Sequence, residues 1–245
     1  HCKNCGNVFS GKFCNNCGQD ANTMRLDWKY VYKEFREKLI TWNESKLFTI
    51  KQLFTRPGNA IRDFIEGKRV NYIKPFSLFF VTAALFAFLY HYFNIDVFSE
   101  LEASGTDSER SKYQTINLWI TGHYSFVTVL TLPLFAIGSY TAFRKQGYNY
   151  IEHLVLNTFI ASQRMIVHIA TFPLLYIYNG TNEIVYITRS LIAVDFVLMV
   201  WVYQQFFNKL TFSKSLLMSI ISYAIFLALF LVLMGIALLI LDLRT

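Results

Sequence analysis

The distribution of apolar residues divides the chain into a polar first part and a strongly apolar remainder. From about residue 76 onward, five apolar runs are each long enough to cross a bilayer as a helix, which takes about 20 residues. They cover about 76–94, 118–143, 153–178, 184–207 and 214–241. Because a helix satisfies its own backbone polar groups in lipid, this pattern predicts an all-α membrane protein with a five-helix transmembrane bundle over residues 76–245.

Residues 21–75 show helical periodicity of an amphipathic kind. A predicted helix follows Asp27, a suitable N-cap, and Pro57 and Gly67 suit the start and the end of a later helix. Two placements fit these cytosolic helices: an apolar face in the lipid headgroup region, or packing against the protein's own bundle. The apolar side of the first helix repeats at helical spacing: Trp28, Val31, Tyr32, Phe35, Leu39 and Trp42.

Positive charge is concentrated ahead of the first apolar run. Of the 23 Lys and Arg residues, 14 lie at or before Lys74, and the net charge is +7. The loops after the second and fourth runs are also basic, whereas acidic residues gather in the predicted outer loop at 97–115. By the positive-inside rule, this asymmetry predicts a cytoplasmic N-terminus and an external C-terminus.

The basic residues also indicate what the protein contacts. A basic, aromatic-rich segment beside membrane spans favours the lipid bilayer and its anionic headgroups as partners over nucleic acid. Two interpretations fit the basic residues nearest the first span: they cradle a phosphate, or they are ordinary positive-inside anchors. These candidate headgroup contacts are Arg56, Arg62, Lys68, Arg69 and Lys74.

All four cysteines lie within the first 18 residues, as Cys2-x-x-Cys5 and Cys14-x-x-Cys17. Two such knuckles supply four thiolates for tetrahedral zinc, and about 20 residues cannot form a core without the free energy of metal binding. Two disulfides would need an oxidising compartment, which a cytoplasmic N-terminus excludes. We therefore predict a structural zinc ribbon at 1–20, docked on the 47–75 segment or on a second protein.

The third apolar run carries a polar stripe at helical spacing. It contains Asn157, Arg164 and His168, and Arg164 lies near the middle of its span, as does Asp195 in the next span. Because an unpaired charge at that depth is costly, we expect Arg164 to pair with Asp195. These four residues are either a pathway or binding site inside the membrane, or a buried pair that fixes helix register. Glu152 and His153, at the start of the span, are expected to be interface residues.

Catalytic sequence motifs are lacking. The chain has no HExxH, GxSxG, P-loop or GxGxxG motif, and the predicted spans carry almost no carboxylates for general acid–base chemistry. The sequence therefore does not favour an enzyme.

Three segments together resemble a known family. The CxxCG…FCxxCGQ ribbon, the segment RPGNAIRDFIEGKRVNYIKPF and the later GYNYIEHLVLNTF are similar to an uncharacterised bacterial family of membrane proteins, a domain of unknown function with a zinc ribbon ahead of several transmembrane helices. The resemblance implies a multi-pass protein of the bacterial cytoplasmic membrane. It also implies that residues 47–75 form one unit that holds the first span, but it assigns no activity.

Two functional hypotheses remain. The first is a non-enzymatic membrane adaptor or assembly component, whose zinc ribbon and cytosolic helices bind a protein partner or a second copy. The alternative is a transporter, channel or lipid-handling protein that uses the polar site around Arg164, His168 and Asp195. A cavity at Arg164 would favour the alternative, and a dry bundle with an exposed ribbon would favour the adaptor.

Overall fold

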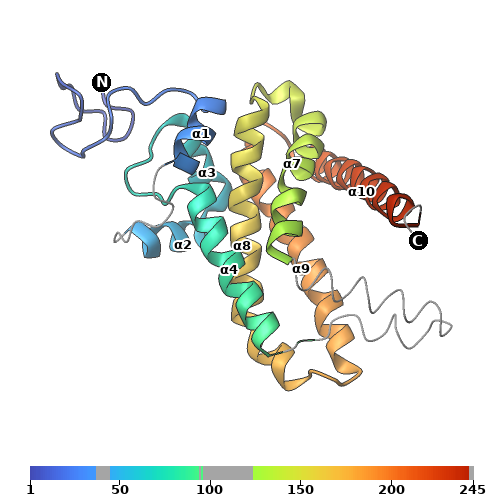
Figure 1. The fold of residues 1–245 in the computed structure, drawn as a ribbon. Helices are drawn as coiled ribbons and strands as arrows, with labels where there is room; N and C mark the ends of the chain where they lie inside the picture. The colour runs from blue at the N-terminus through green and yellow to red at the C-terminus, as the bar shows by residue number, and fades with distance from the viewer. Residues whose placement is uncertain (37–44, 94, 96–123, 243–245) are drawn as a thin grey trace.

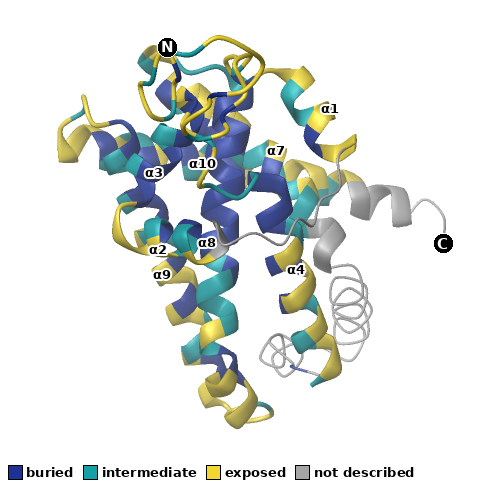
Figure 2. Cartoon of the chain, turned by 90° about the vertical axis from the view of Figure 1, so that its left-hand side faces the viewer, coloured by how far each residue is buried: buried dark blue, intermediate teal, exposed yellow. Residues whose placement is uncertain are grey.

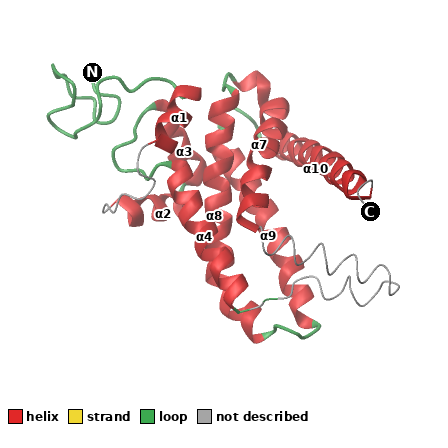
Figure 3. Cartoon of the chain, viewed as in Figure 1, coloured by secondary structure: helices red, strands yellow, loops and turns green. Residues whose placement is uncertain are grey.

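The computed structural model describes residues 1–36, 45–93, 95 and 124–242. These residues form an all-α structure, as predicted, with eight α-helices and one 3-10 turn (Figures 1 and 3). The elements are α1 (Trp28–Arg36), α2 (Ser45–Thr55), α3 (Pro57–Glu66), α4 (Pro75–Tyr92), α7 (Tyr124–Phe143), η1 (Arg144–Gln146), α8 (Tyr150–Ile177), α9 (Glu183–Phe206) and α10 (Phe212–Asp242).

Four of the described helices are long and apolar enough to cross a membrane: α4, α8, α9 and the Phe212–Ile236 part of α10. They coincide with four of the five predicted spans. α7 coincides with the described part of the remaining one, whereas residues 118–123 and the predicted outer loop at 97–115 lie outside the described residues. The long helix α8 is central: α4 and α7 both pack on it, α10 packs mainly on α7, and α3 packs on α9 (Figure 1).

Burial is concentrated at the end of the bundle that carries residues 1–20, the cysteine head (Figure 2). The main core there combines Leu26 with apolar side chains of α3, α4, α7, α8 and α9. A smaller cluster lies at the opposite end, where Phe172 and Leu175 of α8 meet Ile184 of α9 and Ile95. The short helices before the first span are therefore part of the folded core and do not form a separate layer.

Two glycines allow helices to approach closely. A Cβ atom added to Gly58 in α3 would lie 2.5 Å from Cβ of Gln205, and still closer to backbone atoms at the end of α9. A Cβ atom on Gly138 in α7 would lie 2.5 Å from the carbonyl oxygen of Ser222 in α10. Because small residues let helix backbones approach, these positions determine how α3 docks on α9 and how α7 docks on α10.

The predicted helix boundaries are confirmed where the structure describes them. The backbone N–H of Tyr30 donates to the Asp27 carboxylate (3.0 Å), so Asp27 caps α1. Pro57 begins α3, and Gly67 ends it with φ of 114°, a left-handed conformation that glycine adopts without strain. Residues 37–44, which include the predicted apolar positions Leu39 and Trp42, lie outside the described residues.

α1 packs partly on the bundle and leaves apolar side chains exposed, so its placement in the headgroup region stays a prediction. The side chains of Trp28, Tyr32 and Phe35 are exposed, as a helix in the headgroup region requires. Yet the Phe35 ring also packs on Phe76 of α4, with centroids 5.2 Å apart. Glu34 is the buried residue of α1, and its Oε1 accepts the backbone N–H groups of Phe76 (2.9 Å) and Ser77 (3.2 Å). A carboxylate of α1 therefore caps the N-terminus of α4, where the helix dipole favours a negative group.

The segment 47–75 forms one unit, as the family resemblance implied. The buried Thr49 hydroxyl of α2 accepts the backbone N–H of Ile73, just before α4, at 2.9 Å. The Tyr72 ring packs edge-on against Phe48 of α2 and Phe64 of α3. Gln163 of α8 attaches the unit to the bundle by donating to the carbonyl oxygen of Leu53 (2.8 Å).

Candidate functional sites

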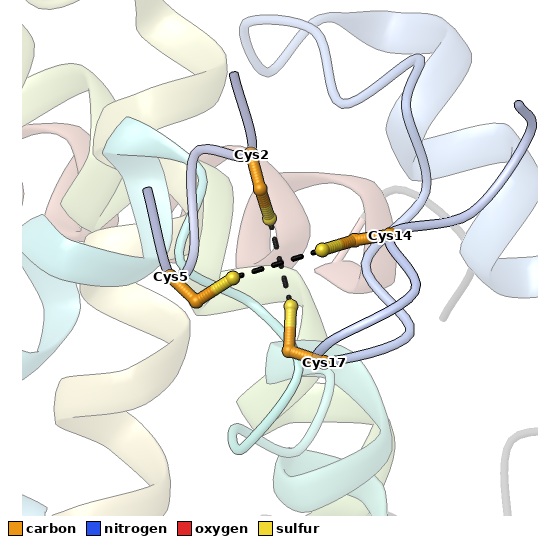
Figure 4. Close-up of side chains that lie close together, drawn as sticks. All are labelled: Cys2, Cys5, Cys14 and Cys17. Atoms are coloured by element: carbon orange, nitrogen blue, oxygen red, sulfur yellow. Dashed lines mark hydrogen bonds between the residues drawn. The ribbon is translucent and has the colours of Figure 1, made fainter. Parts of the chain in front are cut away.

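The four cysteines converge on one point (Figure 4). Their Sγ atoms all lie within 4.8 Å of one another, with Cys2 and Cys17 at 3.5 Å and Cys5 and Cys14 at 3.7 Å. These separations exceed the roughly 2 Å of a disulfide, and all four thiols are free. Four sulfurs at about 2.3 Å from a tetrahedral zinc would be about 3.8 Å apart, so the arrangement is compatible with a four-thiolate metal site.

The two knuckles have the same backbone construction. In each, the first cysteine donates its N–H to a residue five positions later and accepts one from the glycine four positions later: Cys2 with Asn7 and Gly6, Cys14 with Gln19 and Gly18. Gly6 and Gly18 both have φ near 75°, a left-handed turn that directs both sulfurs of a knuckle inward. Hydrogen bonds from the Asn7 backbone and the Asn16 side chain lower the pKa of the Cys5 thiol.

The cysteine head docks on the 47–75 segment, as predicted. The side chain of Gln19, which is buried, donates to the carbonyl oxygen of Gly67 at the end of α3 (3.0 Å). The space around Gly67 is filled by side chains of Lys3 and Thr23. The head therefore rests on the C-terminus of α3 within this same chain.

An ion pair joins the segment after the head to α8. Arg25 donates through Nε and Nη2 to the two carboxylate oxygens of Glu152 (2.7 and 2.6 Å), and through Nη2 to the carbonyl oxygen of Gly147 (2.8 Å). Glu152 also forms a capping box with Asn149 at the start of α8. The same carboxylate thus caps the N-terminus of α8 and binds the segment that follows the head.

Glu152 and His153, which were expected at the membrane interface, are both buried within the protein. Arg25 reaches Glu152 across 127 positions of sequence, and the His153 ring packs between Tyr140 and Phe207. The side chains that bury Glu152 and His153 come from other segments of the chain, which the local sequence pattern around α8 does not reveal.

Two of the predicted headgroup residues make contacts within the protein. Arg62 donates to the carbonyl oxygens of Phe206 (3.1 Å) and Gln205, at the end of α9. Arg69 donates to the carbonyl oxygens of Phe64 (3.1 Å) and Met24 (2.9 Å), and burial lowers the pKa of its guanidinium. These two side chains satisfy helix C-termini, as basic groups do.

The other basic candidates lie nearer the surface. Lys68 contacts the Asp63 carboxylate at 2.8 Å and Arg56 contacts it at 3.2 Å. Lys74 directly precedes α4 and is half-buried. A headgroup role for these residues stays a prediction.

The expected pair in the polar stripe is present. Arg164 of α8 and Asp195 of α9 form an ion pair, with Nη2 and Oδ2 at 2.8 Å. The other carboxylate oxygen of Asp195 contacts His168 Nε2 at 3.1 Å. The Arg164 guanidinium also lies over the Phe135 ring of α7, at 5.7 Å from its centroid. One carboxylate therefore holds two basic side chains that are one turn apart on α8.

Asn157 belongs to a second, fully buried polar cluster. Its amide nitrogen donates to the Ser139 hydroxyl of α7 (2.8 Å), and its amide oxygen accepts from the Tyr203 hydroxyl of α9 (2.8 Å). His153 Nδ1 lies 3.0 Å from the same Ser139 hydroxyl. The structure thus divides the predicted stripe into a cluster around Asn157, nearer the start of α8, and a second cluster around Asp195.

A cavity of about 320 Å³ lies between α7, α8, α9 and α10 and connects the two clusters. Its polar lining includes Asn157, Arg164 and Asp195, while most of its wall is aromatic or aliphatic. The Nε atom of Arg164 is buried and has no hydrogen-bond partner among the described residues. The aromatic wall consists of Phe135, Phe196, Tyr223, Phe226 and Phe230.

Sequence reasoning missed several members of these sites. Ser139, Tyr203 and Gln163 are each unremarkable within an apolar run, because one polar residue per helix is common in membrane spans. A usable signal exists only for Ser139, which adjoins the close-packing Gly138. The partners of all three come from other helices, so only the fold identifies them.

Comparison with known proteins gives one match. No curated protein and no solved structure matches the chain. The model of the family described as "Protein of unknown function (DUF3667)" matches residues 44–87, a range that contains α2, α3 and most of α4, together with the RPG and GKR motifs. The resemblance to an uncharacterised family is therefore confirmed, and the family that this segment matches is DUF3667.

Proposed function

We propose that this protein is a multi-pass membrane protein that holds a lipid-like amphiphile in the cavity between α7, α8, α9 and α10. The observation that carries the proposal is the contact of this cavity with both Arg164 and Asp195. A packed, dry bundle would give the ion pair a purely structural role. A volume of about 320 Å³ is at the lower end of small-molecule sites and accommodates part of a lipid.

The composition of the cavity supports an amphiphilic ligand. Aromatic and aliphatic side chains provide most of the wall, whereas charge is confined to the Arg164–Asp195 pair. The partnerless Nε–H of Arg164 is a donor that a carboxylate, carbonyl or hydroxyl oxygen of a ligand can accept, which would offset the cost of burying it. The proposal is therefore a chain-bearing molecule with one acceptor group.

The proposed orientation has the cysteine head in the cytoplasm of a bacterium. The head, the basic turn η1 and the end of α9 lie at one end of the bundle, since Arg25 contacts Gly147 and Arg62 contacts Phe206. The positive-inside rule assigns that end to the cytoplasmic side of the inner membrane. A reducing cytoplasm keeps four thiols available for zinc, and a closed four-cysteine site is structural rather than catalytic.

Filling the cavity tests the ligand proposal. Ala161 lines the cavity, while Ala170 is an exposed residue of the same helix. The probe is palmitic acid with a photoreactive diazirine in its chain, added to the full chain in nanodiscs. We expect Ala161→Phe to abolish the labelling of peptides that line the cavity, and Ala170→Phe to preserve it. Equal labelling in both variants, at unchanged thermal stability, would refute the proposal.

The ion pair is tested separately. Arg164→Leu with Asp195→Leu removes both charges, which often leaves stability unchanged or raised. Asp195→Leu alone leaves Arg164 without its carboxylate and should cost about 3–5 kcal/mol. We expect the double variant to remain folded and to lose labelling by the probe. If the double variant is stable and still binds the probe, the pair serves only helix register.

A membrane adaptor is the second candidate, and the exposed surface of the head favours it. Val8 and Phe13 are 69% and 63% exposed on the cysteine head, an arrangement that suits contact with a protein partner or a second copy. Val8→Ser with Phe13→Ser keeps the metal ligands. On this hypothesis, the variant retains its metal and loses the larger complex seen by cross-linking in native membranes. A complex of unchanged mass, also after deletion of residues 1–20, would exclude the adaptor role.

A further inference from the structure

A second hollow, of about 400 Å³, lies between the end of α7 with the following turn η1 and the start of α10. It belongs to the head end of the bundle, because Gly147, which follows η1, accepts a hydrogen bond from Arg25. It shares no lining residue with the cavity at Arg164. The side chains that define it are Phe143, Arg144, Lys145, Leu210, Lys214 and Met218.

The cations of this hollow are uncommitted. Arg144, Lys145 and Lys214 are exposed, and within the described part of the chain none of them has a hydrogen bond or ion pair from its side chain. No carboxylate among the described residues lines the hollow, and the nearby Glu152 is bound by Arg25. Three like charges around one hollow repel one another, which an anion there would relieve.

Apart from Thr141 and Gln146, the rest of the lining is apolar. Phe143 is buried, and Leu210 and Met218 are half-buried. One turn before Thr141 on α7 is Ile137, and seven residues after Lys214 on α10 is Ile221. At these spacings they share a helix side with the lining residues, and both are exposed. We call the hollow, together with Ile137 and Ile221 on the helix sides that line it, the groove.

We propose that this groove binds an anionic phospholipid, with its phosphate among Arg144, Lys145 and Lys214 and an acyl chain along α7 and α10. Cations at the cytoplasmic end of spans are suited to anionic headgroups. The apolar continuation favours a lipid over a free phosphate, because only a lipid covers Ile137 and Ile221. The site differs from the headgroup contacts predicted around α3, where Arg62 and Arg69 already bind backbone carbonyls. It does not depend on the proposed function of the Arg164 cavity.

Native mass spectrometry of the full chain in detergent tests this site. Dioleoylphosphatidylglycerol is titrated against dioleoylphosphatidylcholine, which has the same acyl chains. The groove variant combines Arg144→Gln, Lys145→Gln and Lys214→Gln. The matched control combines Lys12→Gln, Lys51→Gln and Lys209→Gln, three exposed lysines outside the hollow that change the net charge equally.

We expect one tight phosphatidylglycerol site in the wild type and the control. A cation near an anionic lipid contributes about a fivefold change in affinity, so the groove variant should bind roughly tenfold to a hundredfold more weakly. Equal weakening in both variants would overturn the proposal in favour of net charge alone. Binding of glycerol phosphate as tight as that of phosphatidylglycerol would overturn the lipid assignment. If the groove variant does not fold, Lys145→Gln and Lys214→Gln singly must each weaken binding, and no change would refute the site.

Discussion

Replacement of Gly58 by alanine examines the contact on which the arrangement of α3 depends. Gly58 belongs to the RPG motif of the family segment and faces the end of α9. An added Cβ would lie 2.5 Å from Cβ of Gln205, whereas ordinary van der Waals contact begins at 3.4 Å. The backbone atoms of Val202 and Phe206 are closer still. Because these are helix backbone atoms, α3 must move away from α9 by about 1 Å.

The expected cost follows from what such a movement breaks. Overpacking of a well-packed interface costs about 1–3 kcal/mol. The shift also lengthens the bond from the Gly58 N–H to Gln205 Oε1, now 3.2 Å, and the bond from Arg62 Nε to the carbonyl oxygen of Phe206, now 3.1 Å, each contributing about 1 kcal/mol. Alanine returns up to about 1 kcal/mol through helix propensity. The net destabilisation of Gly58→Ala is therefore about 2–4 kcal/mol.

Thermal unfolding in detergent, followed by the retention of a monodisperse size-exclusion peak, measures this loss. For a chain of this length, it corresponds to a fall in Tm of roughly 5–15 °C. Gly235→Ala is the matched control, since Gly235 lies in α10 and an added Cβ there meets nothing within 4 Å. It should leave Tm unchanged or slightly raised. A Tm for Gly58→Ala equal to that of this control would show that α3 does not dock on α9 in this way.

Three further perturbations address the cysteine head, its attachment to α8 and the capping of α4. Cys14→Ser, or removal of metal by a chelator, should unfold the head, because metal binding supplies about 10–16 kcal/mol in comparable peptides. Tryptic cleavage after Lys12 should then become fast. If Lys12 stays protected from trypsin, the head does not depend on metal. Arg25→Met should lower the free energy of unfolding by about 1–2 kcal/mol, which is less than the loss of a buried ion pair because the Arg25 side chain is 60% exposed. A double-mutant cycle with Glu152→Gln should give a nonzero coupling energy. Burial raises the pKa of Glu34 above its usual 4.5, so the stability that this group contributes is present below pH 4.5 and is lost as pH rises through the raised pKa. Wild type should therefore gain stability relative to Glu34→Gln as the pH of a thermal melt is lowered toward 4.5. Glu34→Ala, which uncaps α4, should cost about 1–2 kcal/mol above the raised pKa and more at lower pH. Parallel pH profiles for wild type and Glu34→Gln would contradict the raised pKa.

The attachments of the head relate the cysteine site to the rest of the protein. Gln19 holds the head on the end of α3, and Arg25 holds the following segment on the start of α8. α8 carries both Asn157 and Arg164. The segment that follows the cysteine site is therefore attached to the same helix that carries both polar clusters.

The sequence by itself determined those features that depend on local periodicity and spacing. Apolar runs of span length identify the long helices, Pro57 and Gly67 bound α3, and two CxxC knuckles predict the convergence of four sulfurs, because each of these rests on residues within a few turns of one another. The Arg164–Asp195 pair was also predictable, because two charges at matching depths in consecutive spans have few other ways to avoid being buried alone.

The tertiary structure alone decided which other polar groups meet across the bundle. Glu34 caps α4 at a residue 42 positions away, and Arg25 binds Glu152 across 127 positions. Asn157 accepts a hydrogen bond from Tyr203, which lies 46 positions later. The cavity at Arg164 likewise depends on four helices whose side chains fail to fill the space between them. Such contacts follow from the relative placement of helices. Periodicity along one helix specifies which side is polar, but not which neighbour that side faces.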